Sequence, residues 1–257
     1  MAFVTLLTDA GESDHYVAAI KARILSVEPS IRIIDISHGI RPFDIGHAAY
    51  VLRAVFRDFP TGTVHLVGVD AAGSRGETPI AVKLEGHFFV GADNGLFSLL
   101  SDQAAEKVWA LADLSTASST TFPEKEILAP AAARLATRVD PDTIGKAIPD
   151  YRRLTDRQVK ATRKQITGHI IRVDHFGNLV TNIPRHAFDI LSKDKTFTIQ
   201  FGGEKFRRIH PSYNHADQGE CFLVFNSLNF LEIGIYKGNA SELLGLDYDS
   251  VVNIIFE

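Results

Sequence analysis

The segment from Arg172 to Pro184, RVDHFGNLVTNIP, concentrates residue types that could hold a small ligand. Asp174 offers a carboxylate for an ammonium group, and Phe176 offers a flat apolar face. Asn178 and Asn182 offer amide groups that can pair with the edge of a heterocycle. This set suits a ligand with an aromatic base and an amino group. The same letters also fit a β-turn with a core phenylalanine, because Gly-Asn pairs are typical of turns.

Further polar residues follow strand-like runs in the first half of the chain. VTLLTD ends at Asp9 and VHLVGVD ends at Asp70, and small residues follow both. Ligands of open parallel sheets bind outside the carboxyl ends of strands, where a carboxylate can accept hydrogen bonds from the vicinal hydroxyls of a ribose. Each aspartate could equally cap a following helix. Asn94, in GADNGL, fits either a ligand-binding loop or a turn.

The elements that must position these residues differ between the two parts of the chain. The first part alternates short β-branched runs with segments of helical spacing, in the order strand 3–8, helix 15–29, strand 31–37, helix 44–60 and strand 63–70. This order predicts a mostly parallel sheet with right-handed crossovers. Two further strands joined at Glu85-Gly86 and a small-residue helix within 127–139 follow.

A polar stretch with two prolines, residues 140–165, separates this part from seven short strand-like runs. So many short strands separated by turns predict a small barrel or sandwich. We therefore expect an α/β N-terminal domain with a mostly parallel sheet over residues 1–160. A smaller, β-barrel-like C-terminal domain is expected over residues 161–257.

Composition excludes several classes of protein. The chain has 257 residues and a formal net charge of -4, which is unlike the basic surface of a nucleic-acid-binding protein. The single cysteine, Cys221, forms no internal disulfide and is more typical of a buried apolar residue than of a nucleophile, so we expect a cytoplasmic protein. No apolar run is long enough to cross a membrane. HExxH, CxxC and GxSxG motifs are absent, so neither a zinc hydrolase nor a serine hydrolase is supported, and we expect no metal.

Six segments, in order, resemble one protein family. They are VTLLTDAGESDHYVAAIKARI, VHLVGVD, FFVGADNGLFSLL, ILAPAAARLA, DHFGNLVTNI and NSLNFLEIGIYKGNAS. The chain is similar in these segments to the S-adenosylmethionine (SAM) hydroxide adenosyltransferases, relatives of the fluorinating and chlorinating enzymes. The resemblance implies attack of water or hydroxide on C5′ of the ribose, releasing adenosine and L-methionine. It also implies a homotrimer with ligand sites between subunits, and a nucleoside ligand bound without any separate cofactor.

The resemblance also implies roles for individual residues. Asp9 would hold the ribose hydroxyls, Asp174 would bind the methionine amine, and Phe176 would pack on the ligand. The remaining substrate-binding candidates are Asn94, Asn178, Ser227, Glu232 and the backbone at Ala240.

The chain departs from the family where the attacking water is positioned. Asp70 matches the aspartate of an Asp-Arg-His set, but Glu77 takes the place of the arginine and Arg75 lies two residues early. In TFPEKEILAP, Pro123 takes the place of the histidine. Proline offers no exchangeable proton. Asp70, Glu77 and Arg75 remain the catalytic candidates, because a carboxylate pair could bind and deprotonate water.

Three functions therefore remain open. The first is hydrolysis of SAM to adenosine and methionine. The second is a sensor that binds SAM or adenosine without turnover, after loss of the arginine and histidine. The third is an interaction protein that kept only the assembly.

Overall fold

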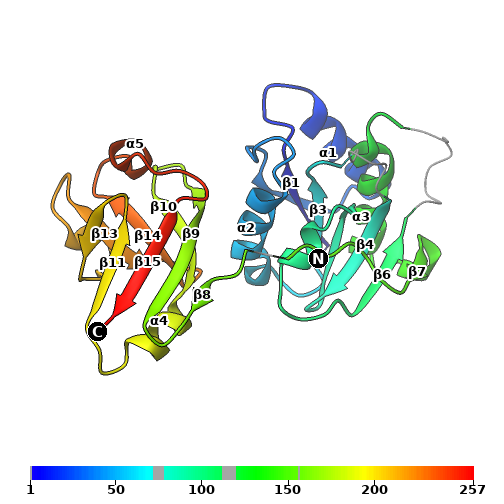
Figure 1. Cartoon of the computed structure of the whole chain (residues 1–257). Helices are drawn as coiled ribbons and strands as arrows, with labels where there is room; N and C mark the ends of the chain where they lie inside the picture. The colour runs from blue at the N-terminus through cyan, green and yellow to red at the C-terminus, as the bar shows by residue number, and fades with distance from the viewer. Residues whose placement is uncertain (1, 72–77, 112–119, 156) are drawn as a thin grey trace. The chain divides into compact units, whose positions relative to one another are not determined.

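The chain forms two compact units, residues 1–155 and 156–257. The structure, a computed structural model, describes residues 2–71, 78–111, 120–155 and 157–257 (Figure 1). The sequence predicts a division at residues 160/161, in the same polar stretch. Each unit is built on one sheet with its own hydrophobic core.

The first unit contains a seven-stranded sheet within its described residues, in the order β2-β1-β3-β5-β4-β6-β7. Its strands are β1 (Phe3–Thr8), β2 (Arg32–Ser37), β3 (Val64–Gly68), β4 (Pro79–Leu84), β5 (His87–Ala92), β6 (Lys107–Ala110) and β7 (Lys146–Ile148). β1 pairs in parallel with β2 and β3, and β3 pairs in parallel with β5. The pairings β5-β4, β4-β6 and β6-β7 are antiparallel.

The prediction of a mostly parallel sheet is therefore wrong, because the sheet is mixed. The cause is a tight hairpin between β4 and β5. Glu85 and Gly86 have φ of 49° and 75°, the left-handed pair that a two-residue hairpin turn requires. A connection this short can only reverse the chain direction, so β4 enters antiparallel and the strands beyond it continue the pattern.

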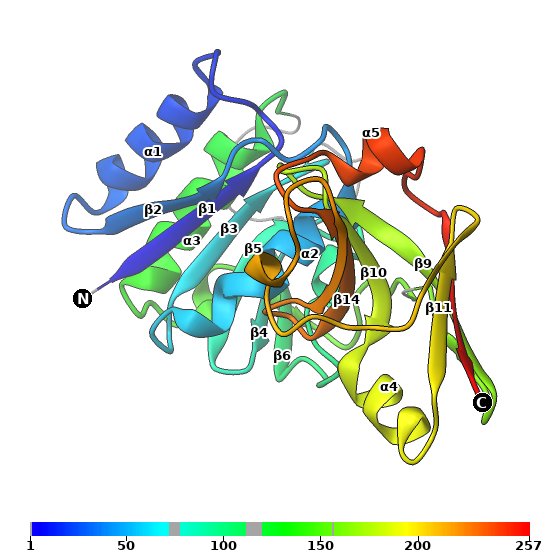
Figure 2. The ribbon, with the colours of Figure 1, turned by 90° about the vertical axis from the view of Figure 1, so that its left-hand side faces the viewer.

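Helices cover both faces of this sheet. The longer ones are α1 (Tyr16–Val27), α2 (Ile45–Val55) and α3 (Ala129–Ala136). α1 and α3 pack side by side on one face, over inward residues such as Leu6 and Leu66, and α2 covers the other face over Leu7 (Figure 2). Because side chains alternate along a strand, each buried strand contributes side chains to a hydrophobic core on both faces of the sheet. The described residues of this unit also form the short helical turns η1 (Phe56–Asp58), η2 (Leu96–Leu99), η4 (Glu124–Leu128) and η5 (Pro141–Thr143).

The second unit is an antiparallel sheet in the order β12-β11-β15-β9-β10-β14-β13, with β8 paired to β9. Its strands are β8 (Lys160–Ala161), β9 (Gln165–Val173), β10 (Leu179–Pro184), β11 (Phe197–Phe201), β12 (Glu204–Phe206), β13 (Cys221–Phe225), β14 (Phe230–Ile235) and β15 (Val251–Phe256). Among the described residues the edge strands β12 and β13 do not pair with each other, so the sheet is a half-barrel rather than a closed barrel.

Two helices and a helical turn accompany this sheet: α4 (Arg185–Ser192), α5 (Ala240–Leu244) and η6 (Tyr213–His215). The residues NASELLGL predict a short helix between strands, and α5 confirms it, whereas α4 was not predicted. Phe188 of α4 packs edge-on against Phe197, with ring centroids 5.0 Å apart, and thereby joins the core of this unit. The contact with Phe197 buries the apolar side of α4 and thereby stabilises this short helix.

Candidate functional site

The two predicted strand-end aspartates meet at the carboxyl edge of the first sheet. Thr8 of β1 lies beside Gly68 of β3, so the residues that follow leave the sheet together. The Asp9 N–H donates to the Gly68 carbonyl at 3.2 Å, and Asp9 Oδ2 accepts from the Asp70 N–H at 3.3 Å. Both aspartates are half-buried. The tertiary structure therefore brings the two aspartates together at the edge where sheets of this kind bind ligands, with the Asp70 backbone against the Asp9 carboxylate.

Asp9 is also bound by a residue that the sequence analysis did not select. The Phe43 N–H donates to Asp9 Oδ2 at 2.8 Å, and Phe43 has φ of 63° with its side chain 72% exposed. A left-handed backbone at a bulky residue is strained and persists only where surrounding contacts impose it. Asp70 has the same conformation, with φ of 46°. The Asp9 carboxylate thus has two backbone donors that fix its orientation.

Asn94 holds the loop after β5 against the end of β3. Its Nδ2 donates to the Val69 carbonyl at 3.0 Å, and its Oδ1 accepts from the Leu96 N–H at 3.1 Å. The side chain is buried, and Gly95 follows with φ of 95°. Asn94 therefore orients the backbone that leads into Asp70, and direct contact with a ligand stays a prediction.

The other two catalytic candidates, Arg75 and Glu77, lie outside the described residues. A different acidic residue reaches this edge of the sheet. Glu124, the first residue of the turn η4, is half-buried and lies over Gly68, where a Cβ would come within 2.9 Å of Glu124 Cγ. Burial raises the pKa of Glu124, and the negative charge of Asp9 raises it further. Glu124 was not among the catalytic candidates, although it directly follows Pro123 in the sequence.

The segment RVDHFGNLVTNIP forms a compact turn between β9 and β10 in the second unit. Asp174 Oδ1 accepts from the N–H groups of Phe176 at 2.9 Å and Asn178 at 2.8 Å. Asp174 Oδ2 accepts from Asn178 Nδ2 at 3.2 Å. Gly177 has φ of 82°, and a Cβ there would lie 2.1 Å from Asn239 Oδ1. The turn therefore seats the acid, the ring and the amide together and presses them against the start of α5.

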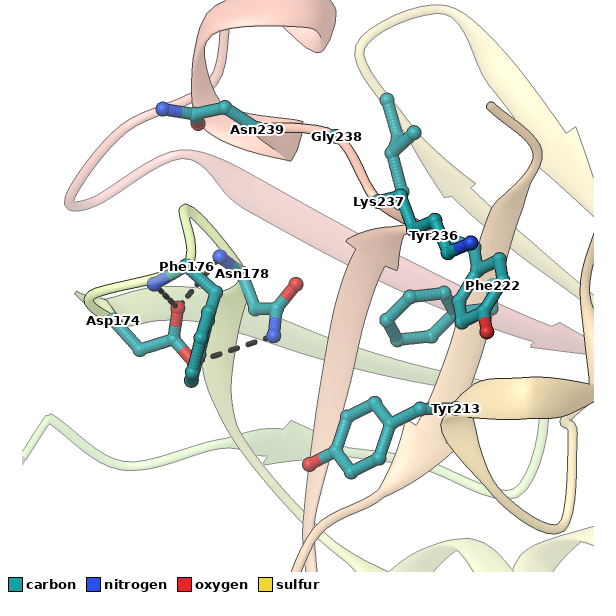
Figure 3. A pocket seen from close by; sticks show the side chains of 10 residues that line it. Asp174, Phe176, Asn178, Tyr213, Phe222, Tyr236, Lys237, Gly238 and Asn239 are labelled. Carbon is teal, nitrogen blue, oxygen red and sulfur yellow. Dashed lines mark hydrogen bonds between the residues drawn. The ribbon is translucent and has the colours of Figure 1, made fainter. Parts of the chain in front are cut away.

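Phe176 is not a core residue, since its side chain is 74% exposed. The segment does form a turn, in which the Gly177 N–H donates to the Asp174 carbonyl at 3.1 Å, but the expectation of a core phenylalanine in that turn is wrong. The ring instead borders a cavity of about 590 Å³, a size typical of small-molecule sites (Figure 3). The cavity is lined by Asp174, Phe176, Asn178, Tyr213, Phe222, Ile235, Tyr236, Lys237, Gly238 and Asn239.

Several residues of this cavity were not among the candidates, although two of them, Tyr236 and Lys237, lie in the segment NSLNFLEIGIYKGNAS. Tyr213, Phe222 and Tyr236 add aromatic faces, and Tyr213 lies edge-on to Phe222 with ring centroids 5.4 Å apart. Lys237 adds a positive charge, its Nζ lying 5.5 Å from the centroid of the Tyr236 ring. These residues come from η6, β13 and the loop after β14, and only the folded sheet brings them to one place.

The remaining candidates occupy different places around this cavity. Glu232 is buried beneath it, and its Oε2 accepts from Asn226 Nδ2 at 3.0 Å. Burial raises the pKa of Glu232, and the charge of Asp174 acts in the same direction. Ala240 is fully buried directly after Asn239. Ser227 is exposed in the turn between β13 and β14 and is not among the residues that line the cavity.

Comparison with known proteins shows the family. The N-terminal domain of the SAM hydroxide adenosyltransferases matches residues 4–145, and the C-terminal domain of that family matches residues 168–253. The chain therefore belongs to the SAM hydroxide adenosyltransferase family.

Individual relatives extend over nearly the whole chain. A Methanocaldococcus jannaschii protein described as (R)-S-adenosyl-L-methionine hydrolase is 31% identical, covering 98% of this chain and 95% of that protein. A Thermus thermophilus protein of the same description is 28% identical over 98% of this chain and 99% of its own length. An uncharacterized conserved protein from Thermotoga maritima superposes with a TM-score of 0.89 at 31% identity, covering 98% and 99% of the two chains.

Other classes of site find no support in the part of the chain that the structure describes. There, no three or more His, Cys, Asp or Glu side chains gather in a way that could hold a metal ion. No described helix combines the length and the apolar character needed to span a bilayer.

Proposed function

We propose that this protein hydrolyses S-adenosyl-L-methionine to adenosine and L-methionine by attack of water on C5′ of the ribose. The observation that carries the proposal is the similarity over 98% of the chain to relatives described as (R)-S-adenosyl-L-methionine hydrolases. The site geometry supports it, because the described carboxylates, aromatic rings and amides match the chemistry of that substrate.

We assign the ribose to the edge of the first sheet. The Asp9 carboxylate is held by two backbone donors, which leaves its second oxygen to accept from the vicinal hydroxyls of a ribose. Asp70 then lies beside the sugar, where its carboxylate can orient a water molecule. In such a reaction the sulfur leaves as a neutral thioether, so no acid has to protonate it. The protein contributes alignment of the water with the C5′–S bond and removal of bulk solvent.

We assign the methionine amine and the adenine to the cavity of the second unit. Asp174 supplies a carboxylate for the ammonium group, and the exposed Phe176 ring supplies a stacking face. Asn178 adds an amide for a polar edge. Ser227, Glu232 and Ala240 keep their predicted substrate-binding roles as proposals, with Glu232 acting from beneath the turn.

The test is a product assay with the purified full chain. Each sulfonium epimer of SAM is incubated separately, because the relatives' descriptions specify the (R) form, and adenosine and methionine are followed by chromatography. In ¹⁸O-labelled water the label should appear at the 5′ oxygen of adenosine. Asp70→Asn removes the charge while asparagine tolerates the left-handed backbone at this position, and the exposed Asp102→Asn is the matched control. If neither epimer yields adenosine above the Asp70→Asn level, the proposal fails.

A second function, binding of SAM or adenosine without turnover, is favoured by one observation. Pro123 is buried and offers no side-chain donor at the position of the family's water-positioning histidine. Calorimetry separates the two functions. A sensor would bind SAM tightly and release no adenosine over hours.

We further propose that the chain assembles as a homotrimer and acts in the cytoplasm. Sedimentation equilibrium of the full chain should return about three times the 28.3 kDa chain mass. A monomer at micromolar concentration would refute the trimer, and fractionation of cells would test the location.

A further inference from the structure

Glu124 lies over the ends of the two strands that carry the aspartates. A Cβ on Gly68 would be 2.9 Å from Glu124 Cγ and 3.3 Å from Thr8 Cγ2. Because glycine has no side chain, position 68 leaves the space that the glutamate needs to approach the sheet this closely. Its carboxyl group is therefore brought to the edge where Asp9 and Asp70 meet.

The turn that carries Glu124 is an unusual helix start. η4 is a π-helical turn, in which the Ala129 N–H donates to the Glu124 carbonyl, and such turns are frequent at functional sites. Pro123 precedes it, and Phe122 packs edge-on against Tyr16 of α1 at a centroid distance of 5.4 Å. These contacts hold the backbone of Glu124 beside the strand ends.

The charges around Glu124 are mainly negative. Asp9 faces it from the end of β1, and Asp70 follows β3 beside Asp9. On its own turn, Lys125 and Glu126 pair with each other at 3.1 Å, both more than 40% exposed. Burial and Asp9 raise the pKa of Glu124, while its own backbone N–H partly opposes the shift. A carboxylate of raised basicity is a better proton acceptor than an ordinary surface glutamate.

We propose that Glu124 is the catalytic base of this chain, accepting a proton from the attacking water in place of the histidine that Pro123 replaces. The inference rests on the proposed function. In the step, the water oxygen bonds to C5′ and the C5′–S bond breaks with its electron pair going to sulfur. One water proton passes to the Glu124 carboxylate and then to solvent. Asp9 holds the sugar and Asp70 orients the water, so each of the three carboxylates has a distinct role.

The experiment compares Glu124→Gln with Glu126→Gln in the full chain. General-base catalysis contributes about 100- to 10,000-fold, so Glu124→Gln should lower kcat by that factor with little change in KM. The wild-type kcat should rise with pH and level off once Glu124 is deprotonated. This rising part of the pH profile, the pH limb, should be absent in Glu124→Gln. Glu126→Gln should keep both the rate and the limb.

Glu124→Ala keeps the inference testable if the glutamine variant folds poorly. Alanine leaves room at the strand ends, and formate should restore part of its activity in proportion to formate concentration. A purely structural role would not produce that rescue. Activity of Glu124→Gln within about threefold of wild type, with its pH limb intact, overturns the inference and leaves hydrolysis standing. Absence of product from the wild-type chain overturns the proposed function and the inference together.

Discussion

The buried histidine of β3 should make the first unit sensitive to acid. His65 is fully buried, with Nδ1 2.7 Å from Thr5 Oγ1 and Nε2 3.2 Å from His87 Nδ1. Its ring stacks on Phe89 at a centroid distance of 4.9 Å. Burial lowers the pKa of His65 to about 3, and the neighbouring His87 acts in the same direction. The native state therefore holds this ring neutral across the ordinary pH range.

The sign of the effect follows from proton binding in the two states. An unfolded histidine titrates near 6.5, whereas native His65 takes a proton only near 3. Between these values the unfolded state binds more protons, so the stabilisation is complete above about 6.5 and falls as the pH falls towards 3. From pH 7 to pH 5 this single group should lower the free energy of unfolding by about 2 kcal/mol, at about 1.4 kcal/mol per pH unit below 6.5. That is a substantial part of the total stability of a domain, about 5–15 kcal/mol.

The assay is urea unfolding followed by fluorescence of Trp109, the only tryptophan in the sequence, which lies in β6 of the same unit. His65→Phe keeps a ring against Phe89 but cannot titrate. It leaves the Thr5 hydroxyl without its histidine partner, at a cost of about 1–3 kcal/mol that does not depend on pH. The loss of stability between pH 7 and pH 5 should therefore be about 2 kcal/mol smaller in the variant. Equal losses in the two proteins would refute the reasoning, because other acid-labile groups are common to both.

Three further outcomes follow from the second unit. Gly177→Ala should lower its stability by more than Gly203→Ala, since both glycines have positive φ but only at Gly177 would a Cβ meet Asn239 Oδ1, at 2.1 Å. We expect a difference of about 1–3 kcal/mol in thermal unfolding, and equal melting temperatures would contradict the close approach. Phe176→Ala should leave stability unchanged, because the ring is 74% exposed, yet weaken adenosine binding up to about tenfold by calorimetry if the ring stacks on the base. Burial raises the pKa of the Cys221 thiol to about 12, so a thiol reagent at pH 8 should label it slowly in the native protein and quickly in urea; fast native labelling would show an open thiolate.

Local patterns predicted most of the individual elements. The spacing of Val17, Ile20 and Ile24 predicts α1, and the run ILAPAAARLATRV predicts α3, because a helical stripe has to find a core. The turn at Glu85-Gly86 was likewise expected from its residue types. The residue types of Ser13 and Asp14 make either one a candidate N-cap, but the N-cap residue of α1 is His15, without a side-chain hydrogen bond. Capping depends on the path of the incoming chain as well as on residue type.

The way these elements are arranged in space could not be predicted from the sequence, for physical reasons. A βαβαβ order predicts parallel strands, and the expected hairpin at Glu85-Gly86 does not by itself show that its two strands extend the same sheet. The mixed character of the sheet was therefore not predicted. α4 was missed because its short stripe resembles a turn until Phe188 meets Phe197. The cavity beside Phe176 draws on four separate segments, and no spacing along the chain relates them.

The sequence by itself determined the residue types at strand ends and turns, and with them the chemistry that this protein can offer a ligand. Asp9, Asp70 and the turn from Asp174 to Asn178 were all recognisable in this way. Only the tertiary structure decided that Glu124 lies near Asp9 at the edge of the sheet. The glycine at position 68 makes this possible, because it leaves room for the Glu124 side chain over the end of β3. The spacing of apolar residues shows which side of a single helix or strand is buried. The distance between carboxylates that are far apart in the sequence depends instead on how the sheet and the helices pack.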